Sequence, residues 1–270
     1  AAAGMGAASV LVSVGYDFPN ARWILRHHPT IPSPVGSSWP RLIALVRHAF
    51  PLGLMAVLGS LYQNIPRFFI ERYQGIQAVG YYSAVFYLTY AGYTVIAAMG
   101  NATSPRLAVS YLESPRKFAR TVTGLTLLGG GIGVTGTIVS LLAGHWVLSV
   151  LYRPEYSQYQ ALLVWIMISS TLWYMATLLV FAAIAAKRFA SQAYLHGLAA
   201  ATTLAFCPLL IPRLGILGAA VALTSGVAVL FVAELVVVRS AIRHWRPGGR
   251  ADLPVGFAPA LSTIDPASIE

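Results

Sequence analysis

The amino-acid sequence predicts an all-α protein, a polytopic transmembrane helical bundle of about six spanning helices. Of its 270 residues, 57% are apolar and only 10% are charged, whereas an ordinary soluble domain has roughly 25% charged residues. The mean hydropathy is +0.69. Six stretches of about 20 or more residues carry little or no charge, and this is the length at which a helix crosses the hydrocarbon core of a bilayer. A water-soluble globular enzyme is therefore excluded.

The segments outside these stretches lack the pattern of a membrane span. Residues 1–15 begin without Met and are too short to cross a bilayer, so we expect the end of a truncated upstream transmembrane helix. Residues 16–41 are polar and contain five prolines, which disfavour helix and predict a cytoplasmic connector. Residues 241–270 have neither periodicity nor enough apolar side chains to pack, which predicts a disordered cytoplasmic tail.

The six-helix lobe is expected over residues 42–240. Its hydrophobic runs predict spans at residues 42–65, 78–103, 121–143, 160–186, 190–211 and 216–238. Cytoplasmic loops carry the excess of Lys and Arg. Thirteen of these residues fall on one side of the six spans and four, Arg67, Arg72, Arg153 and Arg213, on the other. Both ends of the chain are therefore expected in the cytoplasm, and membrane topology explains the net charge of +10 without a nucleic-acid partner.

The first span carries the most polar groups. On a helix, His48, Leu52, Met55, Gly59 and Gln63 lie along one face, which predicts a polar stripe with a glycine-lined middle. Ionisable groups in or beside a span are expensive in lipid and are functional candidates. The candidates for substrate binding here are Arg47, His48, Gln63, Asn64, Arg67 and Arg72. The alternative for Arg47 and Arg67 is that their side chains reach to the two membrane interfaces.

The second span predicts an aromatic helix face. Tyr82, Phe86, Thr89 and Tyr93 recur at helical spacing. Tyr82 is expected near the outer boundary, in the interfacial belt, and Tyr93 lies deeper, in either a hydrated cavity wall or the core. Both are candidate substrate contacts. Asn101 is a third candidate, at a polar helix end that Ser104 and Pro105 are expected to complete just before Arg106.

The remaining spans offer two further signals. Gly129 and Gly133 form a pair of small residues of the kind that lets helices approach closely in lipid. Glu234 is the one carboxylate inside a predicted span, near its cytoplasmic end. It is interpreted either as an interfacial anchor or as a residue that couples transport to protons or sodium.

The sequence gives no support to an enzyme. Its eight acids are scattered, so no two are placed by local spacing to share a metal. His27 and His28 lack a turn-spaced partner, and Cys207 is a single cysteine. No serine or cysteine lies in a recognisable nucleophile motif. We therefore expect no catalytic residue, no metal and no cofactor.

Four stretches of the lobe follow the order and spacing of a known family. They are NIPRFFIERYQGIQAVGYYSAVFYL at 64–88, AAMGNATSPRLAVSYLESPRKFAR at 97–120, LSVLYRPEYSQYQALLVWIM at 148–167 and LLIPRLGILGAAVALTSG at 209–226. They resemble the polysaccharide flippases of the multidrug/oligosaccharidyl-lipid/polysaccharide (MOP) exporter superfamily. These proteins move undecaprenyl-diphosphate-linked oligosaccharides, of the O-antigen type, across the bacterial inner membrane.

The resemblance implies a transporter of two lobes that open alternately to either side. The six spans are similar to the C-terminal lobe of these transporters, and residues 16–41 are similar to the connector between the lobes. The N-terminal lobe is missing from this sequence and is therefore implied as a partner of the six-helix lobe. It also implies a cationic cavity in which Arg47, Arg67 and Arg72 hold the diphosphate while tyrosines and amides contact the glycan. The implied partners are the lipid-linked oligosaccharide, membrane lipid and polysaccharide polymerase machinery.

Three alternatives stay open. One is an exporter of drugs or of another lipid-linked substrate from the same superfamily, although a cation exporter is expected to place acids in its cavity. The second is a membrane enzyme of glycan assembly such as a polymerase, which would need a large external loop or paired carboxylates. The third is a non-transporting membrane component that binds other proteins of glycan assembly.

Overall fold

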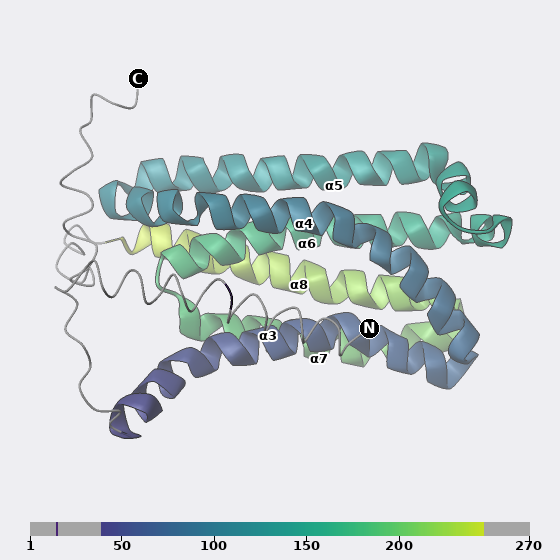
Figure 1. Cartoon of the computed structure of the whole chain (residues 1–270), viewed down its shortest axis with the longest axis horizontal. Helices are drawn as coiled ribbons and strands as arrows, with labels where there is room; N and C mark the ends of the chain where they lie inside the picture. Colours follow the sequence, from purple (N-terminus) through teal and green to yellow (C-terminus); the bar gives the residue numbers. More distant parts are fainter. Residues whose placement is uncertain (1–14, 16–38, 246–270) are drawn as a thin grey trace. The chain divides into compact units, whose positions relative to one another are not determined.

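The computed structural model describes Gly15 and residues 39–245 of the chain (Figure 1). The chain divides into two compact units, Ala1–His48 and Ala49–Glu270. In the first unit only Gly15 and the start of one helix are described. The predicted helix remnant at 1–15 and connector at 16–41 lie almost entirely outside the described residues, as does the tail from residue 246. The side chains of Arg47 and His48 are also outside them.

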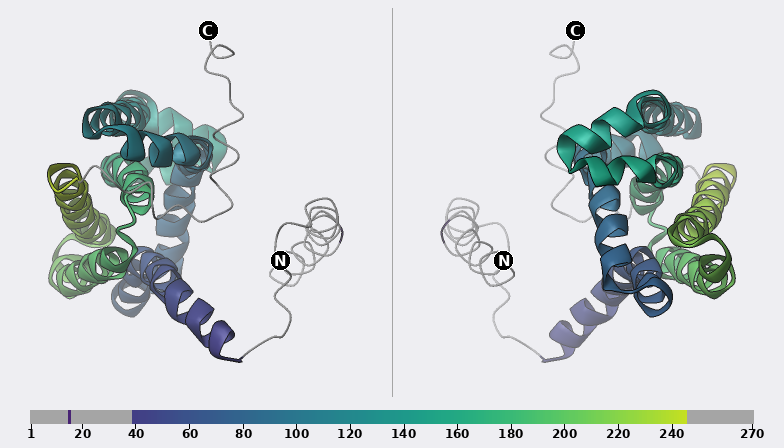
Figure 2. Two further views of the ribbon diagram at one scale, coloured as in Figure 1. Left: turned by 90° about the vertical axis from the view of Figure 1, so that its left-hand side faces the viewer. Right: turned by 90° about the vertical axis from the view of Figure 1, so that its right-hand side faces the viewer.

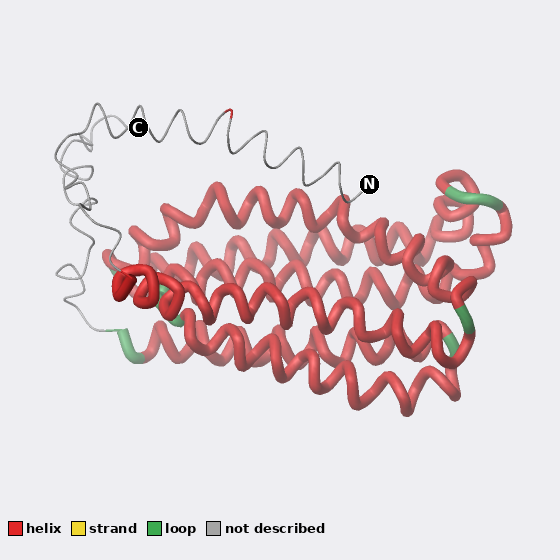
Figure 3. The backbone as a smooth tube through the Cα atoms, turned by 60° about the horizontal axis from the view of Figure 1, so that its bottom comes forward, coloured by secondary structure: helices red, strands yellow, loops and turns green. Residues whose placement is uncertain are grey.

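Six long helices make up the described chain, joined by short connections (Figure 3). They are α3 (Trp39–Gln74), α4 (Ile76–Glu113), α5 (Pro115–Leu151), α6 (Gln160–Ala185), α7 (Phe189–Leu214) and α8 (Ile216–Arg243), with a short 3₁₀ helix, η2 (Pro154–Tyr159), before α6. In residues 39–245 no strand occurs. The predicted all-α class is therefore confirmed.

Single residues separate several of these helices. Gly75 lies between α3 and α4 with φ of 84°, and Gly215 lies between α7 and α8 with φ of 62°. A positive φ is costly for residues with a Cβ atom, so glycine is suited to both corners. Ser114 is the connection between α4 and α5, and its side chain accepts a hydrogen bond from the backbone N–H of Arg116.

The helices extend well beyond the predicted spans. Helix α4 has 38 residues, about 57 Å at 1.5 Å per residue, against roughly 30 Å of hydrocarbon core. The predicted helix end at Asn101, Ser104 and Pro105 is wrong, because α4 continues through Pro105 to Glu113. Hydropathy reports where the chain leaves the apolar layer, whereas a helix can continue into the interface. Helix α8 likewise runs three residues into the predicted tail.

Five helices are long and apolar enough to cross a membrane by length and composition: α4, α5, α6 together with η2, α7 and α8. These five are found among the described residues, and most side chains in the first third of α3 lie outside them. The outward surface fits a lipid environment, because α5 exposes Leu127, Leu142 and Trp146. Large apolar side chains in this number are unusual on a water-exposed surface.

Helix α6 lies at the centre of the second unit. It packs against α4, α5 and α8, and α7 packs mainly on α8. The end-on views show α6 between the α4–α5 pair and the α7–α8 pair (Figure 2). Buried Leu162, Leu163 and Ile166 of α6 join Val85 and Phe86 of α4 in one apolar core. This packing fixes the positions of α3, α4 and α6 side chains around the cavity described below.

The predicted close approach at the small pair is confirmed between α5 and α6. A Cβ atom added at Gly133 would lie 2.5 Å from the Cα atom of Thr171, and one at Gly129 would lie 2.6 Å from a methyl group of Leu178. Thr137 and Thr171 also hydrogen-bond across the two helices through their hydroxyl groups, at 3.2 Å. Glycine lets the two backbones meet here.

Candidate substrate-binding cavity

A cavity of about 500 Å³ lies between α3, α4, α6 and α7. Met55, Gly59 and Gln63 line it from α3, so the face predicted from their spacing does point into a shared space. Ser60 and Asn64 add a hydroxyl and an amide from the same helix. No carboxylate lines the cavity among the described residues. The lining is therefore suited to a neutral polar or an anionic ligand.

One wall of the cavity is aromatic. The rings of Tyr93 on α4 and Trp173 on α6 are stacked, with centroids 4.4 Å apart and an angle of 5° between their planes. Tyr90 packs edge-on against Trp173, and its hydroxyl donates a hydrogen bond of 3.3 Å to Oε1 of Gln63. The sequence left open whether Tyr93 lies in a cavity wall or in the core, and the structure places it in the cavity wall. Aromatic faces beside amides suit the mixed apolar and polar faces of a sugar.

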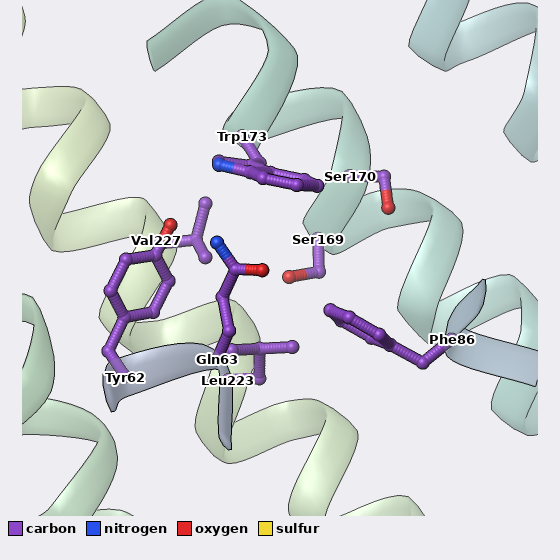
Figure 4. A pocket seen from close by; sticks show the side chains of 8 residues that line it. All are labelled: Tyr62, Gln63, Phe86, Ser169, Ser170, Trp173, Leu223 and Val227. Atoms are coloured by element: carbon purple, nitrogen blue, oxygen red, sulfur yellow. The ribbon is translucent and has the colours of Figure 1, made fainter. Parts of the chain in front are cut away.

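A small recess opens behind this wall, with a volume of about 10 Å³. That is roughly the space of a single water molecule. The Gln63 side chain extends into it toward Trp173 of α6, and the Ser169 hydroxyl is directed toward the Gln63 amide (Figure 4). Tyr62 and Leu223 complete the opposite side. Gln63 thus belongs to both the recess and the larger cavity.

Arg67 lies one helical turn beyond Asn64 and is half-buried. Its Nη1 donates a hydrogen bond to Oδ1 of Asn64, which lines the cavity. Its Cζ atom lies 5.1 Å from the ring centroid of Phe86 and 5.5 Å from that of Tyr87, distances typical of cation–π contacts. The buried Nε and Nη2 atoms have no acceptor among the described residues. A buried donor without an acceptor is costly, so this guanidinium is suited to an anion.

Arg67 does not itself line the cavity, and the other predicted site residues lie elsewhere. Arg72 is exposed in the last turn of α3, and Asn101 is exposed on α4. Tyr82 is fully buried among the helices, and its hydroxyl has no partner in the described part of the chain. None of these three lines the cavity. Glu234 is fully buried between α8 and α7, where Gln192 donates to its carboxylate.

Sequence reasoning missed several residues of the cavity. Trp173, Thr177 and Phe181 come from α6, and His196 from α7. Trp173, Thr177 and Phe181 recur every four residues on α6. This spacing is only a weak signal of a cavity wall, because every span in this sequence has apolar residues at that spacing. Only the packing of α6 against α4 shows which of its faces meets the cavity.

The fold and the cavity together define a class, a multi-pass helical membrane protein with an internal polar and aromatic cavity. Residues 21–110 match the family described as "Polysaccharide biosynthesis protein". The matched residues include Gln63, Asn64, Arg67, Tyr90 and Tyr93. This match covers a third of the chain and confirms its resemblance to polysaccharide biosynthesis proteins.

Individual relatives agree with this assignment. The chain is 24% identical to the capsular polysaccharide biosynthesis protein CapF of Staphylococcus aureus over 204 residues, 75% of this chain and 52% of the relative. It thus spans about half the length of that protein. Two uncharacterized proteins of Mycobacterium tuberculosis strains are 32% identical over 112 residues, 42% of this chain and 26% of each relative. No solved structure matches the chain significantly.

Proposed function

We propose that this chain acts in a flippase that moves undecaprenyl-diphosphate-linked oligosaccharide across the bacterial inner membrane by alternating access, for export of a surface polysaccharide. It has no enzymatic step of its own in this account. The observation that carries the proposal is Arg67, which donates to Asn64 in the cavity wall and whose Nε and Nη2 atoms lack an acceptor among the described residues. The relation to polysaccharide biosynthesis proteins supports the glycan as cargo.

Two parts of the site bind different parts of the lipid-linked oligosaccharide. Arg67 holds the diphosphate through charge-assisted hydrogen bonds, which a planar guanidinium makes in pairs. Gln63, Asn64 and the Tyr93–Trp173 stack contact the first sugars. The polyprenyl tail stays in the bilayer, beside apolar side chains such as Leu127 and Leu142 that the helices expose. The roles of Arg47 and His48 stay predictions from the sequence, because their side chains lie outside the described residues.

The sidedness of the lipid-linked oligosaccharide tests this function. Cells that lack the gene should still make the oligosaccharide but hold it on the cytoplasmic leaflet, with surface polysaccharide lost. The measurement is labelling by a membrane-impermeant lectin in inside-out and right-side-out vesicles. Loss of the lipid-linked oligosaccharide itself would instead favour an enzyme of glycan assembly. Normal sidedness with loss of the polymer would favour a non-transporting component of that machinery.

The aromatic stack gives a prediction about glycan recognition. Replacing Trp173 by leucine is expected to weaken binding of the lipid-linked oligosaccharide about two- to tenfold, because an aromatic contact contributes roughly 0.5–1.5 kcal/mol beyond its buried area. Binding of bare undecaprenyl diphosphate should not change. Equilibrium binding to the protein in lipid nanodiscs measures both. The matched control is Trp146→Leu, because Trp146 is exposed on α5 away from the cavity.

A drug exporter is the second candidate. Organic cations need an anionic cavity, and the described lining of this one contains an imidazole, amides, hydroxyls and aromatic rings but no carboxylate. The flippase is therefore favoured. Normal surface polysaccharide together with raised sensitivity to cationic drugs in cells lacking the gene would reverse this preference.

A further inference from the structure

A buried acidic pair lies between α7 and α8, apart from the cavity lining. Glu234 of α8 and Gln192 of α7 are both 0% exposed. The Nε2 atom of Gln192 donates a hydrogen bond of 3.2 Å to Oε2 of Glu234. Glu234 lies nine residues before the end of α8, so its burial is not that of an anchor reaching the headgroups.

The remaining oxygens of this pair have no donor. Oε1 of Glu234 and Oε1 of Gln192 are buried and have no hydrogen-bond partner among the described residues. Both are acceptors when Glu234 is ionised, so neither can satisfy the other. A buried charge with a single neutral hydrogen bond is expensive inside a membrane-spanning helix bundle.

No cation compensates for this charge in the described chain. The one salt bridge there joins Lys117 to Glu113. Helix α8 packs against α5, α6 and α7. Of the basic side chains on these four helices, only that of His196 is buried. The others are exposed: Arg116, Lys117, Arg120, His145, Arg213, Arg239 and Arg243. Of the other titratable groups, Tyr194 is exposed, Cys207 is buried, and Tyr174 is buried and donates to the backbone oxygen of Thr89.

We propose that Glu234 and Gln192 form a protonation site. A proton taken from water forms an O–H bond at Oε1 of Glu234 and turns that oxygen from an acceptor into a donor. It then donates to Oε1 of Gln192, while Nε2 of Gln192 continues to donate to Oε2 of Glu234. One proton thereby removes the buried charge and satisfies both unpartnered oxygens. The proposal rests on this geometry and does not depend on the proposed transport.

The site is connected to the cavity along α7. The backbone oxygen of Gln192 lies 2.9 Å from Nδ1 of His196, and His196 lines the cavity. Loss of the proton places a charge without a compensating cation beside Gln192, which lies one helical turn before His196. The charge state of Glu234 therefore acts on the packing of α7 and, through His196, on the cavity.

Carbon-13 NMR of the side-chain carboxyl groups tests the proposal directly. The full chain is labelled at the glutamate carboxyl carbons and placed in lipid nanodiscs. Four of its five glutamates lie elsewhere, and Glu71, Glu113 and Glu155 are exposed. One resonance should keep the protonated position at neutral pH and disappear in Glu234→Gln, a neutral variant that can retain the hydrogen bonds.

Two outcomes overturn the proposal. In the first, all glutamate resonances ionise together. In the second, sodium chloride but not choline chloride moves the Glu234 resonance to its ionised position at constant pH, which assigns a sodium ion instead of a proton. If Glu234→Gln does not fold, the triple replacement of Glu71, Glu113 and Glu155 by glutamine identifies the same resonance by removing the exposed ones. Glu270 is then removed by truncation.

Discussion

Replacing Arg67 by glutamine is expected to weaken binding of undecaprenyl diphosphate about 10- to 100-fold. A hydrogen bond to a charged group contributes roughly 1.5–3 kcal/mol, and each 1.4 kcal/mol is about tenfold in Kd. The buried Nε and Nη2 atoms of Arg67 have no acceptor in the described structure, and the proposed function gives them the diphosphate as acceptor. Equilibrium binding to nanodiscs that contain the chain measures the change.

Matched variants separate a direct role of Arg67 from a general effect of charge. Arg72→Gln removes a positive charge from the same helix at an exposed position and should leave the Kd unchanged. Arg67→Lys keeps the charge but loses the paired donors, so it should bind with intermediate affinity. In the chromosomal gene, Arg67→Gln should lower surface polysaccharide with normal protein abundance. The role of Arg67 is refuted if Arg72→Gln and Arg67→Gln weaken binding equally.

The second large effect is expected at the contact between α5 and α6. Valine at position 133 would place its Cβ 2.5 Å from the Cα atom of Thr171, so the two backbones must separate. Overpacking of this kind typically costs about 1–3 kcal/mol. We expect a lower thermal unfolding temperature in detergent and less folded protein in the membrane for Gly133→Val.

Gly131→Val is the matched control for this packing prediction. Gly131 lies two residues away on the same helix, is exposed, and would have no atom within 4 Å of an added Cβ. Both substitutions carry the same helix propensity, so their difference reports the contact with α6 alone. Equal unfolding temperatures for the two variants would show that this contact does not hold the helices together.

Much of the fold was predictable because the apolar composition of each span predicts a membrane-spanning helix. The run of apolar residues identifies a helix even without its partners, and the small residues Gly129 and Gly133 identify where one helix meets another. Helix ends were less predictable. Pro105 and Asn101 indicate a break in soluble proteins, yet α4 continues through both, since membrane helices tolerate proline where neighbouring groups satisfy the freed backbone oxygen.

The cavity was predictable only on the helix that carries its polar groups. The stripe of Met55, Gly59 and Gln63 could be identified from helical spacing, because polar residues stand out in an apolar span. Trp173 and His196 could not, since their contribution depends on how α6 and α7 pack. Helical spacing also does not distinguish Tyr82, which is buried, from Tyr93, which lines the cavity. The two residues share a helix face, but the face turns from the core at Tyr82 to the cavity at Tyr93 along the length of α4.

The central claim is that the head of a lipid-linked oligosaccharide enters the cavity between α3, α4, α6 and α7. Site-specific photocrosslinking tests it most directly, with a photoreactive phenylalanine derivative in place of Thr177, which lines the cavity, or of Val232, which is exposed on α8. Radiolabelled lipid-linked oligosaccharide is expected to crosslink at position 177 and to be displaced there by unlabelled oligosaccharide lipid, whereas any crosslinking at position 232 should not be displaced. Crosslinking at position 177 that is absent, or that unlabelled lipid does not displace, would contradict the account.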